Sequence, residues 1–276
     1  MSTPPPVPVA LTIAGSDPSG GAGIQADLKT FHRFDVYGTA VITLLTVQNT
    51  CRVSAVEPVP PELIAAQLRA VLEDIPPRAA KTGALGTAAA IRAVAELLAG
   101  TEFPLVVDPV MVSKHGAPLM SEEACDVLRR ELLPRAYLVT PNLPEAAALS
   151  GLAVSGIEEM EHAARRISEL GPRAVLVKGG HLDGDAVDLL WDQGRSSLLR
   201  ERRISTTSTH GTGCTYSAAI AALLAQEDDL PTATALAKQF VTEAIRTAPG
   251  LGAGYGPLNH HAGWDQGVPQ PGKARL

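Results

Sequence analysis

The sequence predicts an α/β fold, a three-layer α/β/α sandwich around a twisted central sheet that is mainly parallel with some antiparallel strands. Short apolar runs alternate with segments of helical periodicity through most of the chain, which is typical of consecutive strand–helix units. Ala186–Trp191 and Ser197–Leu199 flank the turn Gln193-Gly194, so this part of the sheet is expected to be antiparallel. Polar residues follow several predicted strands, and a parallel sheet would bring them to one edge.

The composition is that of a globular protein. Of the 276 residues, 45% are hydrophobic and 19% are charged, which argues against disorder. A net charge of −6 leaves no basic surface for nucleic acid or an anionic membrane, and no apolar run is long enough to cross a bilayer. The three cysteines show no CxxC spacing, and Met1–Pro8 lacks the apolar core of a signal peptide. We therefore expect a cytoplasmic chain that binds neither nucleic acid nor membrane.

One domain is expected over residues 9–250, because no interior stretch has the composition of a linker. Residues 1–8 are proline-rich and are expected to be a flexible N-terminus. Residues 251–276 are rich in glycine, proline and polar residues, so the same composition argument predicts a loose C-terminal tail.

The predicted strands are short runs of apolar and β-branched residues that end at glycine, proline or polar residues. The first ends at Gly15 and the second ends just before Gln48. In chain order the segments are Val7–Ala14, Thr39–Val47, a short strand and turn over Ala79–Gly86, Leu105–Asp108, Tyr137–Thr140, Ala174–Val177, Ala186–Trp191 and Ser197–Leu199.

The predicted helices are recognised by apolar residues three or four positions apart and by signals at their ends. Ile24, Leu28 and Phe31 share one face of the first helix, and Pro60-Pro61-Glu62 starts the second, which continues to Leu72. The remaining helices are expected at Thr87–Ala99, Ser121–Leu132, Ala146–Leu149, Glu158–Leu170, Gly213–Ala225 and Pro231–Thr247.

The glycine-rich stretch His210–Ser217 precedes a predicted helix and has the composition of an anion site. Gly211 and Gly213, on either side of Thr212, let the backbone approach a ligand, and the helix N-terminus would direct N–H groups at a phosphate. Cys214 is the one side chain there able to act as base or nucleophile, and helix N-termini lower the pKa of thiols. The alternative interpretation is a glycine turn with a buried cysteine.

Further candidates stand at the predicted strand ends. Gln48 follows the second strand, Asp108 ends a buried run, Glu145 lies in the first turn of a helix, and Lys178 precedes two glycines. Each has an ordinary structural interpretation, as a turn, capping or surface residue. Together with Gly15 they supply carboxylates for a divalent cation and a lysine for phosphates, so their joint placement predicts a site for phosphoryl transfer.

Asp27 lies in the helix that follows the glycine-rich loop Gly15–Gly23. An aspartate at this place is either a solvated residue on the helix surface or a group that reaches back to a ligand held by the loop. The pattern alone leaves both interpretations open.

Residues 15–30, GSDPSGGAGIQADLKT, form a long and specific motif, and shorter motifs follow it along the chain. With its motifs in this order, the sequence resembles the hydroxymethylpyrimidine/phosphomethylpyrimidine kinases of thiamine biosynthesis, in the ribokinase-like superfamily. The resemblance covers about residues 9 to 250. The motifs that carry the resemblance after the first are Gln48-Asn49-Thr50, Lys81-Thr82-Gly83, Val107–Met111, Thr140–Glu145, Lys178–His181 and His210–Cys214.

The resemblance implies ATP-dependent phosphorylation of 4-amino-5-hydroxymethyl-2-methylpyrimidine and then of its monophosphate, with ATP and Mg²⁺ as cofactors and a homodimer as the assembly. By analogy with the family, the residues concerned are Gly15, Asp27 and Gln48 for the pyrimidine, Lys178 and Asn142 for ATP, Asp108 and Glu145 for Mg²⁺, and Gly211, Thr212 and Gly213 for the anion hole, with Cys214 as the base.

Two residues depart from the family pattern. Ala84 stands where methionine is usual, and His115 stands where serine is usual. A smaller residue at position 84 enlarges the acceptor pocket, which leaves a pyridoxal kinase of the same fold as the alternative, although Gln48 favours the pyrimidine. The alternative of another class is a non-catalytic ligand-binding protein, against which the intact Gly211–Cys214 stretch argues.

Overall fold

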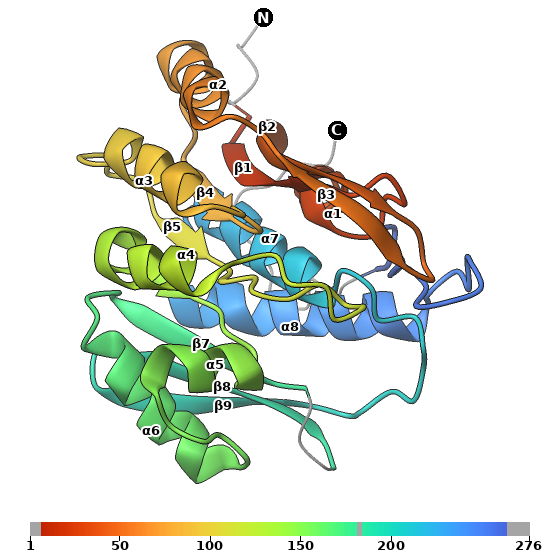
Figure 1. Ribbon diagram of the computed structural model, residues 1–276. Helices are drawn as coiled ribbons and strands as arrows, with labels where there is room; N and C mark the ends of the chain where they lie inside the picture. The colour runs from red at the N-terminus through yellow and green to blue at the C-terminus, as the bar shows by residue number, and fades with distance from the viewer. Residues whose placement is uncertain (1–6, 181–183, 264–276) are drawn as a thin grey trace, which may run out of the picture.

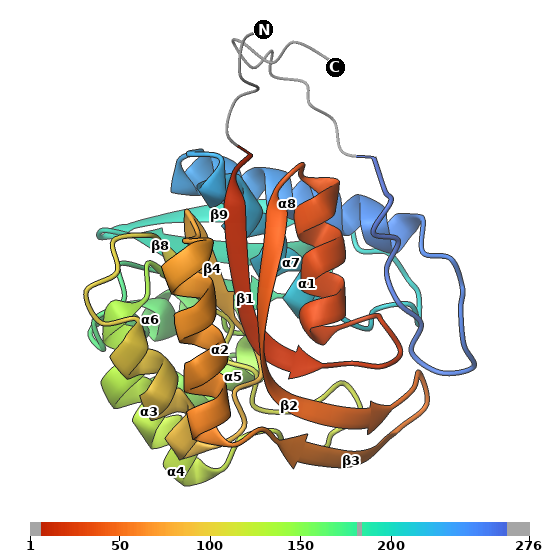
Figure 2. The same cartoon turned by 90° about the horizontal axis from the view of Figure 1, so that it is seen from above.

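The computed structural model describes residues 7–180 and 184–263, and in this part of the chain one nine-stranded sheet runs through the molecule (Figures 1 and 2). The strand order is β3-β2-β1-β4-β5-β6-β7-β8-β9, parallel from β2 to β7 and antiparallel at both edges. The predicted sheet, mainly parallel with antiparallel additions, is confirmed. The strands are β1 Val9–Ser16, β2 Tyr37–Gln48, β3 Val53–Pro58, β4 Ala79–Thr82, β5 Leu105–Val107, β6 Leu138–Val139, β7 Ala174–Gly179, β8 Ala186–Asp192 and β9 Arg195–Glu201.

Helices cover both faces of the sheet and complete the three predicted layers (Figure 1). One apolar core lies between the sheet and helices α2 to α6, and the other lies between the sheet and α1, α7 and α8. The helices are α1 Gly23–Arg33, α2 Pro61–Asp74, α3 Ala88–Leu97, α4 Glu122–Val127, α5 Leu143–Ser150, α6 Ile157–Ser168, α7 Thr212–Ala225 and α8 Leu230–Arg246.

Helix α7 is the most enclosed helix of the second core. Every residue from Thr215 to Ala225 is buried, because α7 packs on α1 and α8 and against strands β1, β4 and β5. Its alanines let neighbouring backbones come close on all sides, and this explains why the segment has no amphipathic pattern. The packing fixes the N-terminus of α7 relative to the strand ends.

Three sequence-based expectations need correction. Strand β3 was not predicted, because it is an edge strand with mostly exposed side chains and ends at Pro58. The helix predicted over Ser121–Leu132 continues beyond α4 as a π-helical turn, Leu128–Leu132. Residues 251–263 are not a loose tail, since Leu258 and Ala262 are buried in the second core. Residues 1–6 and 264–276 of the predicted flexible ends lie outside the described residues.

Within the described part of the chain, each helix is too short or too polar to cross a membrane.

The packing of α7 predicts a large response to overpacking. Ala221 is fully buried, so we expect Ala221→Leu to lower the free energy of unfolding by about 1–3 kcal/mol. The matched control is Ala89→Leu, at an exposed position of α3, because alanine and leucine have similar helix propensities. Urea unfolding followed by circular dichroism measures both variants. Equal stability of the two would contradict the close packing of α7.

Candidate active site

A cavity of about 610 Å³ opens where the carboxyl ends of the parallel strands meet the start of α7. The chain passes from β1 to β2 on one side, whereas β4 lies on the other side of β1, and such a reversal of strand order is where open α/β sheets bind ligands. All the predicted site residues except Asp27 line this cavity, namely Gly15, Gln48, Asp108, Asn142, Glu145, Lys178, Gly211, Thr212, Gly213 and Cys214.

The turn before α7 lies directly on the loop that follows β1. Gly211 has a φ of 80°, and a Cβ at this position would lie 1.8 Å from the carbonyl oxygen of Gly21. A Cβ on Gly213 would lie 3.3 Å from Lys178 Nζ and 3.5 Å from Asp108 Oδ2. The N-terminus of α7 therefore faces both an ammonium and a carboxylate, so an anion here would meet a positive dipole end and a lysine.

Asp108 joins the ends of three neighbouring strands. Its Oδ1 accepts hydrogen bonds from Lys178 Nζ at 2.7 Å and from Thr140 Oγ1 at 3.1 Å. Burial lowers the pKa of Lys178, but the charges of Asp108 and Glu145 outweigh burial and raise it. Lys178 is therefore a cation at neutral pH and is available to a phosphate.

Glu145 and Asn142 form a capping box at the start of α5. Asn142 Oδ1 accepts from the Glu145 amide, and Glu145 Oε2 accepts from the Asn142 amide, both at 2.9 Å. Burial raises the pKa of Glu145 to about 7, with Lys178 lowering it and Asp108 raising it. The second carboxylate of the cavity is thus held in place by the helix that it caps.

A magnesium ion fits Asp108 and Glu145 by donor type. Among residues 7–180 and 184–263, no group of three or more His, Cys, Asp or Glu side chains is arranged to hold a metal. Mg²⁺ usually takes one or two protein carboxylates and completes its shell with waters and substrate phosphates. Burial, and to a lesser extent the charge of Asp108, raises the pKa of Glu145, and a cation held by both carboxylates would oppose this rise.

The thiol of Cys214 does not have the protonation state that its position predicts. Burial raises the pKa of Cys214 to about 11, although the charge of Lys81 and the N–H of Gly23 lower it. The prediction of a lowered thiol pKa is therefore wrong for this structure, because desolvation outweighs the Lys81 charge and the Gly23 N–H that favour the thiolate.

Asp27 does not line the cavity, so its predicted contact with the pyrimidine is not supported. The side chain is fully buried, accepts from Thr12 Oγ1 at 2.6 Å and forms an ion pair with Lys81 Nζ at 3.0 Å. Because α1 begins at Gly23, Asp27 lies one turn inside the helix and faces the sheet. Lys81, which is equally buried, ends near the cavity floor, since a Cβ on Gly83 would lie 3.2 Å from its Nζ.

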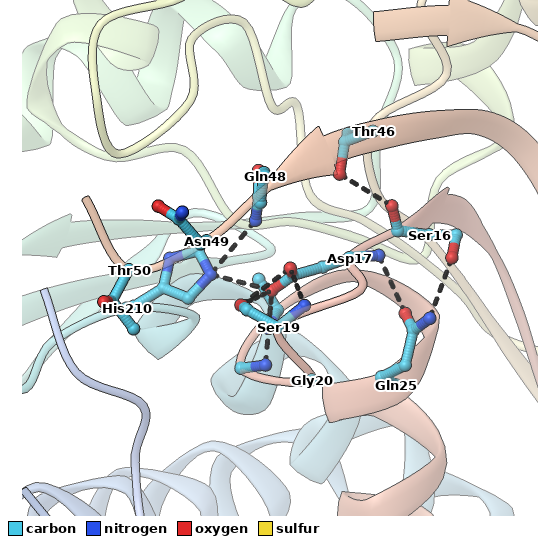
Figure 3. A network of polar contacts seen from close by, with 12 residues as sticks. Ser16, Asp17, Ser19, Gly20, Gln25, Thr46, Gln48, Asn49, Thr50 and His210 are labelled. Atoms are coloured by element: carbon cyan, nitrogen blue, oxygen red, sulfur yellow. Dashed lines mark hydrogen bonds and ion pairs between the residues drawn. The ribbon is translucent and has the colours of Figure 1, made fainter. Parts of the chain in front are cut away.

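Sequence reasoning also missed Asp17 and His210, which form a polar network with Gln48 (Figure 3). Asp17 Oδ2 lies 2.8 Å from His210 Nε2, and Gln48 Nε2 lies 3.2 Å from the same nitrogen. Asp17 and His210 are both buried. They stand inside motifs that carried the family resemblance, but nothing in the spacing of residues 17, 48 and 210 indicates that they meet. His181 of the Lys178–His181 motif lies outside the described residues.

A hairpin-like segment, residues 110–119, borders the cavity and is tied to two other parts of the chain. Val112 and Pro118 form a bridge, and His115 Nε2 donates to the carbonyl oxygen of Thr50 at 2.9 Å. The His115 ring also lies edge-on to Tyr255, with centroids 5.6 Å apart. His115, which departs from the family pattern, thus connects this segment to the turn after β2 and to the C-terminal segment.

The family model for phosphomethylpyrimidine kinase matches residues 17–259. The chain belongs to this family. The hydroxymethylpyrimidine/phosphomethylpyrimidine kinase of Streptomyces coelicolor is 48% identical over 270 residues, which are 97% of this chain and 100% of that protein. The thiamine biosynthesis bifunctional protein ThiED of Geobacter sulfurreducens is 53% identical over 254 residues, or 91% of this chain, and the match spans 51% of that longer protein.

A solved structure of a related vitamin kinase has the same fold as this family member. The pyridoxal kinase from Staphylococcus aureus, in complex with AMP-PCP and pyridoxal, matches with a TM-score of 0.86 at 38% identity, covering 93% of this chain and 95% of that chain. The predicted ribokinase-like architecture is confirmed by this likeness.

The buried Asp27–Lys81 pair predicts a strong stability effect. Lys81→Met leaves an uncompensated buried carboxylate, so we expect a loss of about 3–5 kcal/mol in the free energy of unfolding. Adding Asp27→Asn removes that charge and is expected to restore part of the loss. The control is Arg78→Met, which breaks the solvent-exposed pair with Glu227 and is expected to cost less than about 1 kcal/mol. A Lys81→Met loss no larger than the control would contradict this account.

Proposed function

We propose that this chain transfers the γ-phosphoryl group of ATP to the hydroxymethyl group of 4-amino-5-hydroxymethyl-2-methylpyrimidine and then phosphorylates the resulting monophosphate. One observation carries the proposal. The N-terminus of α7, the Lys178 ammonium and the Asp108 carboxylate converge in one cavity, and Gln48 stands in the wall of the same cavity. Phosphoryl transfer needs positioning and neutralisation of charge more than covalent chemistry from the protein.

The residues of the cavity divide into a phosphate side and an acceptor side. Lys178 and Asn142 would contact the phosphates of ATP, and Asp108 and Glu145 would hold Mg²⁺. The metal would neutralise charge on the transferred group. At the start of α7 the backbone from Gly211 to Gly213 would bind the oxygens of the phosphoryl group as it transfers.

The acceptor side is formed by Gly15 and Gln48. A Cβ on Gly15 would lie 2.5 Å from Leu44 Cδ1, so glycine lets the strand end pass close to the neighbouring strand and leaves room for a ring. The Gln48 amide offers a donor, which matches the ring nitrogen of an aminopyrimidine. Cys214, on the boundary of the two sides, is the group to which we assign the proton of the acceptor hydroxyl.

Pyridoxal phosphorylation is the second candidate, and two observations favour it. Ala84 lines the cavity, where a larger side chain would reduce the space for an acceptor. The likeness to the Staphylococcus aureus pyridoxal kinase supports the same alternative.

A homodimer is our expectation for the assembly, by analogy with the family.

The acceptor is tested by steady-state kinetics with Mg-ATP and a coupled assay for ADP. We expect higher kcat/KM for the hydroxymethylpyrimidine than for pyridoxal, together with turnover of the pyrimidine monophosphate, because Gln48 matches the aminopyrimidine edge. A higher value for pyridoxal would overturn the assignment. Absence of ADP release with every acceptor would favour a ligand-binding protein.

Cys214 is tested by substitution and by pH. We expect Cys214→Ala and Cys214→Ser to lose most turnover, roughly 10²-fold, while binding the acceptor as the wild type does. Below a pKa of about 11 the thiolate fraction rises tenfold per pH unit, so wild-type kcat/KM should rise between pH 7 and 9 and the variants should lose this slope. Cys125→Ser, in α4, is the control. Near-normal turnover of both Cys214 variants would remove the residue from this role.

A further inference from the structure

The contact between Gln48 and His210 is unusual because it joins two nitrogens. Gln48 Nε2 and His210 Nε2 lie 3.2 Å apart, and the same histidine nitrogen lies 2.8 Å from Asp17 Oδ2 (Figure 3). The other ring nitrogen, Nδ1, is buried and has no hydrogen-bond partner among the described residues. Nε2 is therefore the atom through which the ring acts on its surroundings.

Asp17 determines that His210 Nε2 carries a hydrogen. The Asp17 carboxylate accepts from the amides of Ser19, Gly21 and Ala22 and from the Ser19 hydroxyl, so both of its oxygens are occupied as acceptors. Burial raises the pKa of Asp17, but the hydrogen bonds from His210 and Ser19 outweigh it and lower the pKa to about 2. An ionised carboxylate only accepts, so the hydrogen of the Asp17–His210 bond belongs to the imidazole.

The histidine ring is also fixed in position. A Cβ on Gly21 would lie 2.6 Å from His210 Cδ2 and 3.1 Å from Pro257 Cβ, so the ring is enclosed between the loop after β1 and the C-terminal segment. The His210 amide donates to the carbonyl oxygen of Gly256 at 3.0 Å. Neither the ring nor its hydrogen is free to turn away from Gln48.

A nitrogen that carries hydrogen cannot accept from the amino group of Gln48. The oxygen and nitrogen of a glutamine amide are distinguished only by their hydrogen bonds. The amide oxygen is therefore the atom that faces His210, where it shares the single Nε2 hydrogen with Asp17 Oδ2 in a three-centre bond. The amino group then faces the cavity, which Gln48 lines. The orientation of the amide is thus set by Asp17 through His210.

We propose that Asp17 and His210 are positioning residues that lock the Gln48 carboxamide in one orientation and thereby set which hydroxymethyl-substituted ring the cavity accepts. This inference rests on the proposed function. An aminopyrimidine presents a ring acceptor beside an amino donor, whereas pyridoxal presents a formyl acceptor beside a hydroxyl group. An amide locked with its amino group toward the cavity donates to the ring acceptor of the aminopyrimidine but cannot accept from the hydroxyl group of pyridoxal, whereas a free amide can turn to serve either edge.

The test is a double-mutant cycle read as a ratio, kcat/KM for the hydroxymethylpyrimidine over kcat/KM for pyridoxal. We expect His210→Leu to lower the ratio about three- to tenfold, which corresponds to the loss of one oriented hydrogen bond. In a Gln48→Ala background the same substitution should change the ratio less than about twofold, because His210 acts through Gln48. His210→Gln keeps a donor near Asp17 and should retain most of the preference. His261→Leu, at an exposed histidine, is the control and should leave the ratio unchanged.

Each outcome decides one question. A wild type that phosphorylates neither acceptor, or that prefers pyridoxal, overturns the proposed function and this inference with it. If the wild type prefers the pyrimidine, the proposed function stands. If His210→Leu then changes the kcat/KM ratio equally in the wild-type and Gln48→Ala backgrounds, the positioning role of Asp17 and His210 is overturned. Loss of the preference in His210→Gln as complete as in His210→Leu also overturns it, and thermal melting identifies any variant that fails to fold.

Discussion

The candidate site depends on the contact between the backbone at Gly211 and the carbonyl of Gly21. A side chain at Gly211 would overlap that carbonyl oxygen, so the loop after β1 and the start of α7 can meet only at glycine. The contact brings together two segments nearly two hundred residues apart in the sequence. Because α7 is buried from Thr215 to Ala225, the position of its N-terminus is set by the whole second core. The backbone at the start of α7, which we propose binds the phosphoryl oxygens, is therefore placed by packing.

Charge within the cavity is balanced locally. Lys178 pairs with Asp108, and Lys81 pairs with Asp27 beneath the cavity floor. Desolvated charges are stable when paired, and the same partners are then available to an incoming phosphate or cation. The acidic net charge of the chain is compatible with an anionic substrate, because the positive groups that it needs are held within the cavity.

Sequence patterns predicted the layers and the polar strand ends, since hydrophobic periodicity and strand termination are local properties. For that reason the prediction that Gln48, Asp108 and Lys178 lie at one edge of the sheet holds, and all three line the same cavity. The ion pair of Asp27 with Lys81 could not be predicted, because Lys81 lies in another strand and no local pattern connects the two residues. Asp17 and His210 were missed for the same reason, and β3 was missed because its exposed residues carry no periodic signal. Residues 251–263 look like a tail by composition, yet Leu258 and Ala262 fill the second core.

Cys214 shows how burial can reverse a local rule. A helix N-terminus stabilises a thiolate, but desolvation raises the pKa of Cys214 to about 11. At neutral pH about one molecule in ten thousand then carries the thiolate. A loose transition state places little charge on the attacking hydroxyl before the phosphoryl group arrives, so it requires little from a base. In the proposed reaction most of the catalytic effect would therefore come from the backbone and cations around the phosphoryl group, which need no proton transfer to act.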